Sequence, residues 1–154
     1  MFDRLFPSSA ASQYSGGRGA VWLATLLVLV KMAIALGSMF NGHYAASVVD
    51  GIPLDQYTPA GAQAVLALFA NLGFSQLLIG AIGLLVVARY RALLPGYLLL
   101  LVLEHGGRKA IALFLPIPRV GGAGGGTVTW AIIGLLVLAL VLSLRGRSAS
   151  SSAA

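Results

Sequence analysis

Residues 19–40 read GAVWLATLLVLVKMAIALGSMF, an apolar run with one charge, Lys31, in its middle. A helix that crosses the hydrocarbon core of a bilayer needs about 20 mainly apolar residues, and this run is long enough. The apolar core of a cleavable signal peptide has only about 7–15 residues, so we interpret the run as a retained span. The segment therefore predicts a transmembrane helix that carries an ionisable group.

Three more apolar runs follow the first one. Thr58-Pro59 precedes the second run and is typical of a helix start, with a hydroxyl cap and a proline at the first helical position. None of the runs shows the alternation of apolar and polar residues expected of barrel strands. We therefore predict an all-α fold, an integral membrane four-helix bundle over residues 19–144. Its helices are expected at about 19–40, 61–88, 92–115 and 127–144.

The composition agrees with a membrane class. Hydrophobic types make up 58% of the 154 residues and charged types 9%, with a mean hydropathy of +0.93. Soluble domains carry roughly 25% charged residues, so a soluble monomer is excluded, and such a hydrophobic chain is not disordered either. The absence of cysteine excludes disulfides and thiolate metal sites.

Arginine residues indicate the orientation. They precede the first run, fill the turn between the second and third runs, and follow the fourth, whereas the loop after the first run has two aspartates and no lysine or arginine. Cytoplasmic loops carry the excess of Lys and Arg, so both termini are expected in the cytoplasm (N-in, C-in). Residues 1–18 then form a cytoplasmic N-terminal segment and residues 145–154 a disordered cytoplasmic tail. The net charge of +6 is interpreted as this topology signal and not as a nucleic-acid surface.

Three polar residues inside the runs fall at one predicted depth. Lys31, Gln76 and Glu104 each lie twelve positions from the inner end of their span, roughly 18 Å at about 1.5 Å per residue. An ionisable group at the bilayer centre costs about 2.5–3.5 kcal/mol, so each needs a partner or a function. Small residues share the helix faces of the first two and would allow close helix approach. Those are Ala24, Ala35 and Ser38 around Lys31, and Gly73, Gly80 and Gly83 around Gln76.

The third run adds the densest polar segment. Glu104 and Arg108 are four residues apart, the favourable spacing and order for an ion pair on a helix. Asn71 lies at the depth of Arg108, and we expect the two to meet. His105 is expected to donate a hydrogen bond to another helix, and Lys109 to extend toward the outer surface.

Two further expectations concern glycine and the fourth run. The Gly106–Gly107 pair would loosen the third helix or admit a neighbouring backbone. The fourth run has no internal charge and is expected at the periphery. The predicted polar cluster, and the ligand-binding candidates, are Lys31, Asn71, Gln76, Glu104, His105 and Arg108.

Three kinds of role are open to this cluster: a structural ion network, a ligand or ion site, or catalysis. The leading hypothesis is non-enzymatic, either binding of a small amphiphilic ligand (a lipid, quinone or isoprenoid) or an accessory role in a membrane complex. One alternative is a proton-coupled small-solute transporter with Glu104 as carrier and Lys31 as counter-charge, which with four spans would require a homodimer. Another is a membrane-embedded enzyme with Glu104 as acid or base and Arg108 as anion binder. Zinc and di-iron spacings are absent, and we expect no metal, no cofactor and no nucleic-acid partner.

The four-span layout, the basic turn Arg89-Tyr90-Arg91 and the glycine-dotted second run together resemble the DoxX-like group of small bacterial membrane proteins, over roughly residues 21–141. The resemblance rests on layout. It implies a protein of the bacterial inner membrane and suggests an accessory subunit of redox or stress-related machinery. It assigns no residue roles.

Overall fold

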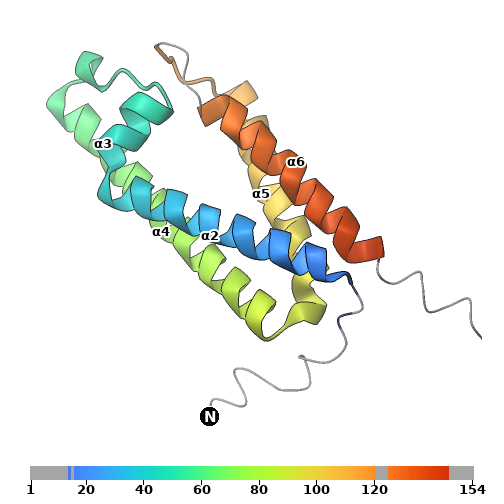
Figure 1. Cartoon of the computed structure of the whole chain (residues 1–154). Helices are drawn as coiled ribbons and strands as arrows, with labels where there is room; N and C mark the ends of the chain where they lie inside the picture. Colours follow the sequence, from blue (N-terminus) through green and yellow to red (C-terminus); the bar gives the residue numbers. More distant parts are fainter. Residues whose placement is uncertain (1–13, 15, 121–124, 146–154) are drawn as a thin grey trace, which may run out of the picture.

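The computed structural model describes residues 14, 16–120 and 125–145, and all regular structure in these ranges is helical. Four long helices form the body of the molecule (Figure 1). The first and last residue of each helix lie within two residues of the bounds predicted from the sequence. The predicted terminal segments, 1–18 and 145–154, lie almost wholly outside the described residues. The long helices are α2 (Arg18–Phe40), α4 (Pro59–Ala88), α5 (Leu94–Phe114) and α6 (Gly125–Arg145). The short elements are α3 (Gly42–Tyr44), the π-helical η2 (Ala45–Val49), and the 3₁₀ turns η3 (Leu54–Gln56) and η4 (Arg91–Leu93).

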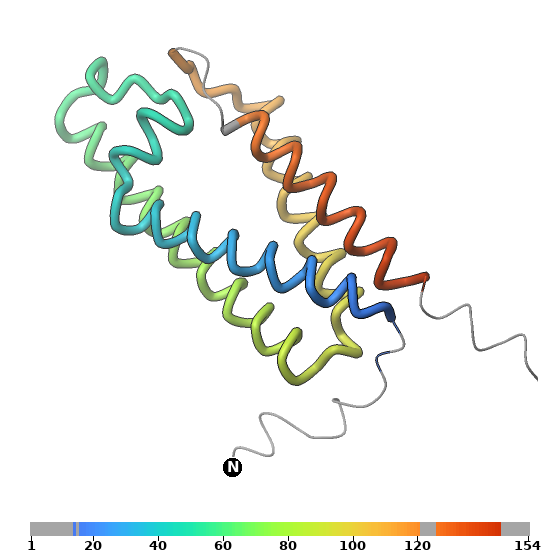
Figure 2. Tube along the Cα trace, in the orientation of Figure 1, coloured from blue at the N-terminus to red at the C-terminus, as the bar shows by residue number. Residues whose placement is uncertain are grey.

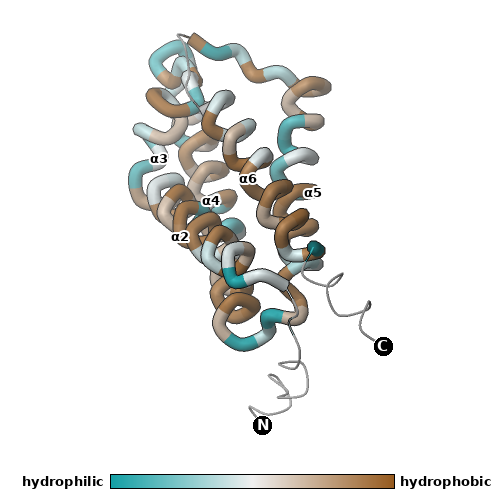
Figure 3. The backbone as a smooth tube through the Cα atoms, turned by 45° about the vertical axis from the view of Figure 1, so that its right-hand side comes forward, coloured by the Kyte–Doolittle hydropathy of each residue, from teal (hydrophilic) through white to brown (hydrophobic). Residues whose placement is uncertain are grey.

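Three of the long helices are long and apolar enough to cross a membrane. They are α2, α4 and residues Gly126–Arg145 of α6, with mean hydropathies of 2.2, 1.9 and 2.5. Their large apolar side chains face outward in numbers that suit a lipid environment, as Leu78 and Ile82 of α4 illustrate. Helix α5 is not among the three because its second half carries Glu104, Arg108 and Lys109. Figure 3 shows the same contrast, with hydrophilic residues in the loops and along part of α5.

The start of α4 follows the predicted capping pattern. The Oγ1 of Thr58 accepts a hydrogen bond from the backbone N–H of Gly61 at 3.2 Å, and Pro59 is the first helical residue. The cap satisfies one of the N–H groups that a helix start leaves without a partner, and proline has no N–H to satisfy. The prediction of a helix start at Thr58-Pro59 is confirmed.

The helices form two side-by-side pairs, α2 with α4 and α5 with α6, and α2 also packs against α6 (Figures 1 and 2). Glycines bring α2 and α4 close together. A Cβ added to Gly73 would lie 2.7 Å from the carbonyl oxygen of Ala35, and one added to Gly80 would lie 2.5 Å from the Cγ of Met32. The predicted small-residue face of α4 is thus a helix contact.

Helix α6 is not peripheral, and that expectation was wrong. Its Leu136 and Ala139 are buried in the main apolar core. At its other end, Lys109 of α5 donates a hydrogen bond to the carbonyl oxygen of Gly126 at 3.3 Å and lies 5.7 Å from the centre of the Trp130 ring. A helix without internal charge still packs against α2 and α5 here, because helix association in a membrane depends on shape complementarity and specific hydrogen bonds rather than on the polarity of the helix.

Two apolar cores lie at opposite ends of the bundle. The larger one gathers where α4 turns into α5, around Leu94, Leu98 and Leu101. The smaller one packs the loop residues Ile52 and Leu54 onto the first turns of α4. A backbone hydrogen bond of 2.8 Å from the N–H of residue 120 to the carbonyl of residue 51 ties this loop to the chain that follows α5. The middle of the bundle between these cores is where the polar residues lie.

Candidate functional site

Lys31 lies on the buried side of α2. Its side chain is only 5% exposed, and Ala24, Val28 and Ala35 on the same helix are fully buried. Small side chains at these positions let α4 and α6 approach, and the lysine then points between helices rather than toward lipid. A buried ammonium group in such surroundings requires partners, because desolvating it alone costs several kcal/mol.

Two partners from two other helices satisfy Lys31. Its Nζ donates to the Oε1 of Gln76 in α4 at 2.9 Å and to the Oε2 of Glu104 in α5 at 2.6 Å. The structure therefore brings together Lys31, Gln76 and Glu104, the three residues for which the sequence predicted a common depth. The contact links α5 to the α2–α4 pair through side chains that are 45 and 73 residues away from Lys31 in sequence.

The second oxygen of Glu104 faces Arg108. The Nη2 of Arg108 lies 3.0 Å from Oε1, an ion pair between residues four apart on the helix. Oε1 is buried and accepts no hydrogen bond from the described residues, so this contact has ion-pair distance without hydrogen-bond geometry. Lys31, Glu104 and Arg108 thus form a chain with one net positive charge.

The other two candidates occupy different places. The Nδ1 of His105 is bonded to the carbonyl oxygen of Leu101 in its own helix at 3.0 Å, and within the described residues the ring does not form the expected hydrogen bond to another helix. The same atom is 3.7 Å from the Oε2 of Glu104, too far for a hydrogen bond. Asn71 is exposed, and its Nδ2 donates to the carbonyl oxygen of Ala67 at 3.0 Å. The structure therefore places His105 beside the ion chain and keeps Asn71 out of it.

Two further details differ from the sequence-based expectations. A Cβ added to Gly106 or Gly107 would meet no atom within 4 Å, so no neighbouring backbone approaches this pair. Lys109 is turned toward α6 by the carbonyl of Gly126 and the Trp130 ring instead of extending along α5 to the surface.

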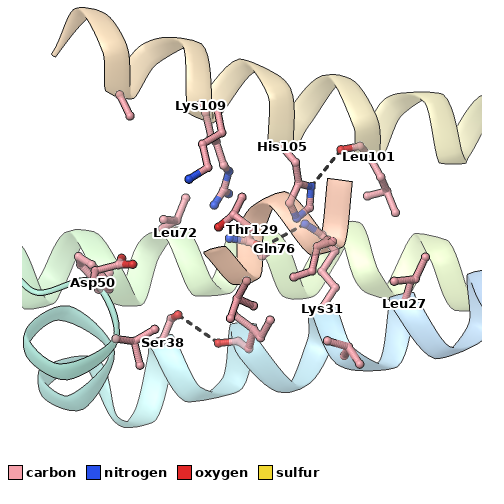
Figure 4. Close-up of a pocket in the computed structure, with 18 of the residues that line it drawn as sticks. Leu27, Lys31, Ser38, Asp50, Leu72, Gln76, Leu101, His105, Lys109 and Thr129 are labelled. Carbon is pink, nitrogen blue, oxygen red and sulfur yellow. Dashed lines mark hydrogen bonds between the residues drawn. The ribbon is translucent and has the colours of Figure 1, made fainter. Parts of the chain in front are cut away.

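A cavity of about 530 Å³ adjoins the ion chain. Its apolar walls come mainly from α2, α4 and α6, and its polar side comes from α5 and the loops. Figure 4 shows His105 and Lys109 extending from α5 toward the space, with Asp50 and Leu72 on the opposite side. The lining residues that matter below are Val30, Lys31, Ile34, Ser38, Asp50, Phe69, Leu72, Gln76, His105, Arg108, Lys109, Arg119, Val128, Ile132 and Leu136.

The loop end of the cavity is electrostatically asymmetric. Arg108, Lys109 and Arg119 line it together with a single carboxylate, Asp50. Burial raises the pKa of the Asp50 carboxyl above its usual range, and the positive charges of Arg119, Lys109 and Arg108 act in the opposite direction. This end of the cavity is therefore rich in cations.

Sequence reasoning missed part of this site. Asp50 and Arg119 lie in loops, and Val128 and Ile132 belong to the helix that was expected at the periphery. The excess of basic residues near the loop end of α5 was the one available signal for a charged end of the cavity. Apart from Thr129, which lines the cavity, the pattern of α6 does not distinguish its cavity-lining side, because the helix is otherwise largely apolar.

Fold and site together suit an integral membrane protein with a chain of ion pairs beside a partly open cavity. No protein-family model matches the chain, and neither does any curated protein or solved structure. Among the described residues, no group of three or more His, Cys, Asp or Glu side chains is placed to hold a metal ion. The function has to be inferred from the cavity and its charges.

Proposed function

We propose that this chain is a four-span integral membrane protein that binds a small amphiphilic ligand between its helix pairs and does not act as an enzyme. The observation that carries the proposal is the cavity of about 530 Å³, which has apolar walls and a charged side. Small-molecule sites typically measure about 300–1,000 Å³ and combine apolar walls with a few polar groups. An ion chain that served only to fix helix register would need no such space beside it.

The proposal takes α5 as the fourth span. Its residues 94–114 reach about 31 Å at 1.5 Å per residue, the thickness of a hydrocarbon core. The charges that lower its hydropathy have partners. Glu104 forms ion pairs with Lys31 and Arg108, and Lys109 donates a hydrogen bond to the carbonyl oxygen of Gly126. Ion pairing and the adjoining cavity reduce the cost of placing these groups at membrane depth.

The arginines support the N-in, C-in orientation. Arg18 at the start of α2, Arg89 and Arg91 at the α4–α5 turn, and Arg145 at the end of α6 lie at one end of the bundle (Figure 1). Two aspartates, Asp50 and Asp55, lie in the loop at the opposite end. Under the positive-inside rule, the arginine end faces the cytoplasm.

Cysteine labelling tests this orientation. The chain has no cysteine, so Gln56→Cys in the exposed first loop and Ser148→Cys in the C-terminal segment each give a single reactive thiol. A membrane-impermeant maleimide applied to intact cells should label Gln56→Cys and should reach Ser148→Cys only after the membrane is opened. Labelling of both from the same side would refute the four-span topology.

The layout and the basic turn also support, as part of this proposal, a place among DoxX-like proteins of the bacterial inner membrane. The succession of α2, α4, α5 and α6, the turn Arg89-Tyr90-Arg91 between α4 and α5, and the glycines of α4 carry that resemblance.

Two serines provide a matched test of the cavity. Ser38 of α2 and Ser75 of α4 each donate to a carbonyl four residues earlier at 3.1 Å, but only Ser38 lines the cavity, whereas Ser75 is exposed. Dodecanol bearing an alkyl diazirine should crosslink saturably to lining residues such as Ile132 in phosphatidylcholine nanodiscs. Ser38→Phe places an aromatic ring in part of the cavity and should reduce that crosslinking roughly tenfold, the effect of losing about 1.4 kcal/mol of binding.

Ser75→Phe is the control, and its crosslinking at Ile132 should equal that of the wild type. Crosslink positions are read by peptide mass spectrometry, which separates cavity labelling from labelling of the lipid-facing surface. If crosslinking at the lining residues does not saturate, or if both phenylalanine variants reduce it equally, the proposed binding function is wrong.

A further inference from the structure

Positive charge exceeds negative charge around the cavity. The lining holds four cationic side chains and one carboxylate, and Glu104 adds a second carboxylate behind the wall. The cations are Lys31, Arg108, Lys109 and Arg119, and the lining carboxylate is Asp50. Two positive charges remain in excess while His105 is neutral.

The cations differ in how fully they are already engaged. Lys31 is buried between Gln76 and Glu104, and its hydrogen bonds of 2.9 and 2.6 Å occupy it inside the protein. Lys109 bonds to a carbonyl of α6 and lies over the Trp130 ring. Neither needs an added anion.

Arg108 and Arg119 are less engaged. Arg108 is 35% exposed, lines the cavity, and meets Glu104 only as an ion pair without hydrogen-bond geometry. Arg119 is exposed, lines the same cavity and forms no ion pair with any residue of the described ranges. A guanidinium group presents several N–H donors in one plane and suits the paired oxygens of a carboxylate or phosphate.

The walls beside these arginines are apolar. Val30 and Ile34 of α2, Leu72 of α4, and Val128 and Ile132 of α6 contribute to the lining. A free inorganic anion would gain nothing from these side chains, whereas an alkyl or isoprenoid chain would remove them from water. The arrangement therefore fits a molecule with a charged end and an apolar chain.

We infer that the ligand of this site is an anionic amphiphile, with a carboxylate or phosphate headgroup held by Arg108 and Arg119 and its apolar chain between α2 and α6. This inference rests on the proposed binding function and names the ligand class. Two excess positive charges match a phosphate monoester, and they also accommodate a carboxylate. A cationic amphiphile would be repelled by the same residues.

Competition against the dodecanol diazirine probe tests the headgroup. The competitors are dodecyl phosphate, dodecanoate, unlabelled dodecanol and inorganic phosphate, each added to the protein in phosphatidylcholine nanodiscs. The three amphiphiles are compared by their mole fraction in the membrane, and inorganic phosphate by its concentration in solution. Dodecyl phosphate or dodecanoate should displace half of the probe at a mole fraction about tenfold or more lower than dodecanol requires. This difference is expected for hydrogen bonds to charged groups. The better of the two identifies the headgroup. Inorganic phosphate alone should not displace it.

The double variant Arg108→Gln with Arg119→Gln should reduce the preference for the anionic competitor to about twofold or less. Its displacement by dodecanol should remain that of the wild type, which shows that the cavity is still folded. Arg18→Gln with Arg145→Gln removes the same charge from exposed positions at the other end of the bundle and should keep the full preference.

The outcomes separate the two proposals. If dodecanol competes as well as the anionic amphiphiles, the anionic headgroup is refuted and amphiphile binding stands. If inorganic phosphate competes as well as dodecyl phosphate, the site binds a free anion and the inference is overturned. A preference that survives in the Arg108/Arg119 variant overturns the assigned residues. If no competitor, including dodecanol, displaces the probe from the cavity, the proposed function itself fails.

Discussion

Replacing Glu104 with leucine should lower the free energy of unfolding by about 3–5 kcal/mol, the usual cost of removing one partner of a buried ion pair. The loss arises at Lys31, whose side chain is 5% exposed and would keep only the amide of Gln76 as a partner. Arg108 contributes less to the loss because it is 35% exposed in the cavity and can be hydrated there. Equilibrium unfolding in mixed detergent and SDS micelles measures the change.

The double variant Lys31→Met with Glu104→Leu should recover most of this loss and return to within about 1 kcal/mol of the wild type. It removes both members of the 2.6 Å pair and leaves apolar side chains of similar size in a buried position. Asp55→Asn, which neutralises an exposed carboxylate of the first loop, serves as the control and should leave the unfolding free energy unchanged. If the double variant is no more stable than Glu104→Leu alone, the Lys31–Glu104 pair does not account for the effect.

Replacing Gly73 with alanine should destabilise the protein by about 1–3 kcal/mol, and Gly73→Leu should do so more strongly. The added Cβ would lie 2.7 Å from the carbonyl oxygen of Ala35 and 3.1 Å from the backbone nitrogen of Met39. Both contacts are to backbone, so relief requires α2 and α4 to separate. That separation would also lengthen the Lys31–Gln76 hydrogen bond, one turn further along α4.

Two other glycines calibrate this prediction. Gly80→Ala should cost less than Gly73→Ala, because the nearest atom is the Cγ of the flexible Met32 side chain. Gly107→Ala should be neutral or stabilising by up to about 1 kcal/mol, since a Cβ there meets nothing within 4 Å and alanine favours the helix. Equal effects of Gly73→Ala and Gly107→Ala, again from unfolding in micelles, would show that close α2–α4 packing is not limiting.

Only two features of the site could be predicted from the sequence: contacts set by the spacing of residues within one helix, and contacts between residues at equal distances from the predicted helix ends. The Glu104–Arg108 spacing follows from the helix itself, and the contact of Lys31 with Gln76 and Glu104 was anticipated from their equal distances to the predicted helix ends. Asn71 satisfied the same depth argument and yet bonds to its own helix, because depth fixes a height along the bundle and not a direction around the helix.

The side of each helix that meets a neighbour was harder to predict. Helix α4 carries apolar residues all round, so no amphipathic face marks its contact with α2, and only the glycines at 73 and 80 indicate it. Helix α6 offers no comparable mark, and its contribution to the cavity became visible only when Leu136, Val128 and Ile132 were placed in space.

The sequence by itself determined the four helices, their ends and the polar groups inside them, because backbone hydrogen bonds form within each segment and apolar length decides which segments suit a bilayer. The tertiary structure decided which helices are neighbours, that α6 rather than Asn71 completes the surroundings of the ion chain, and that Arg108 and Arg119 line one cavity. In lipid, an apolar helix gains no hydrophobic energy from packing against one apolar helix rather than another. Which helices become neighbours therefore depends on close approach of backbones at glycines and on individual hydrogen bonds and ion pairs between residues far apart in the chain. Neither property leaves a periodic signal in the sequence.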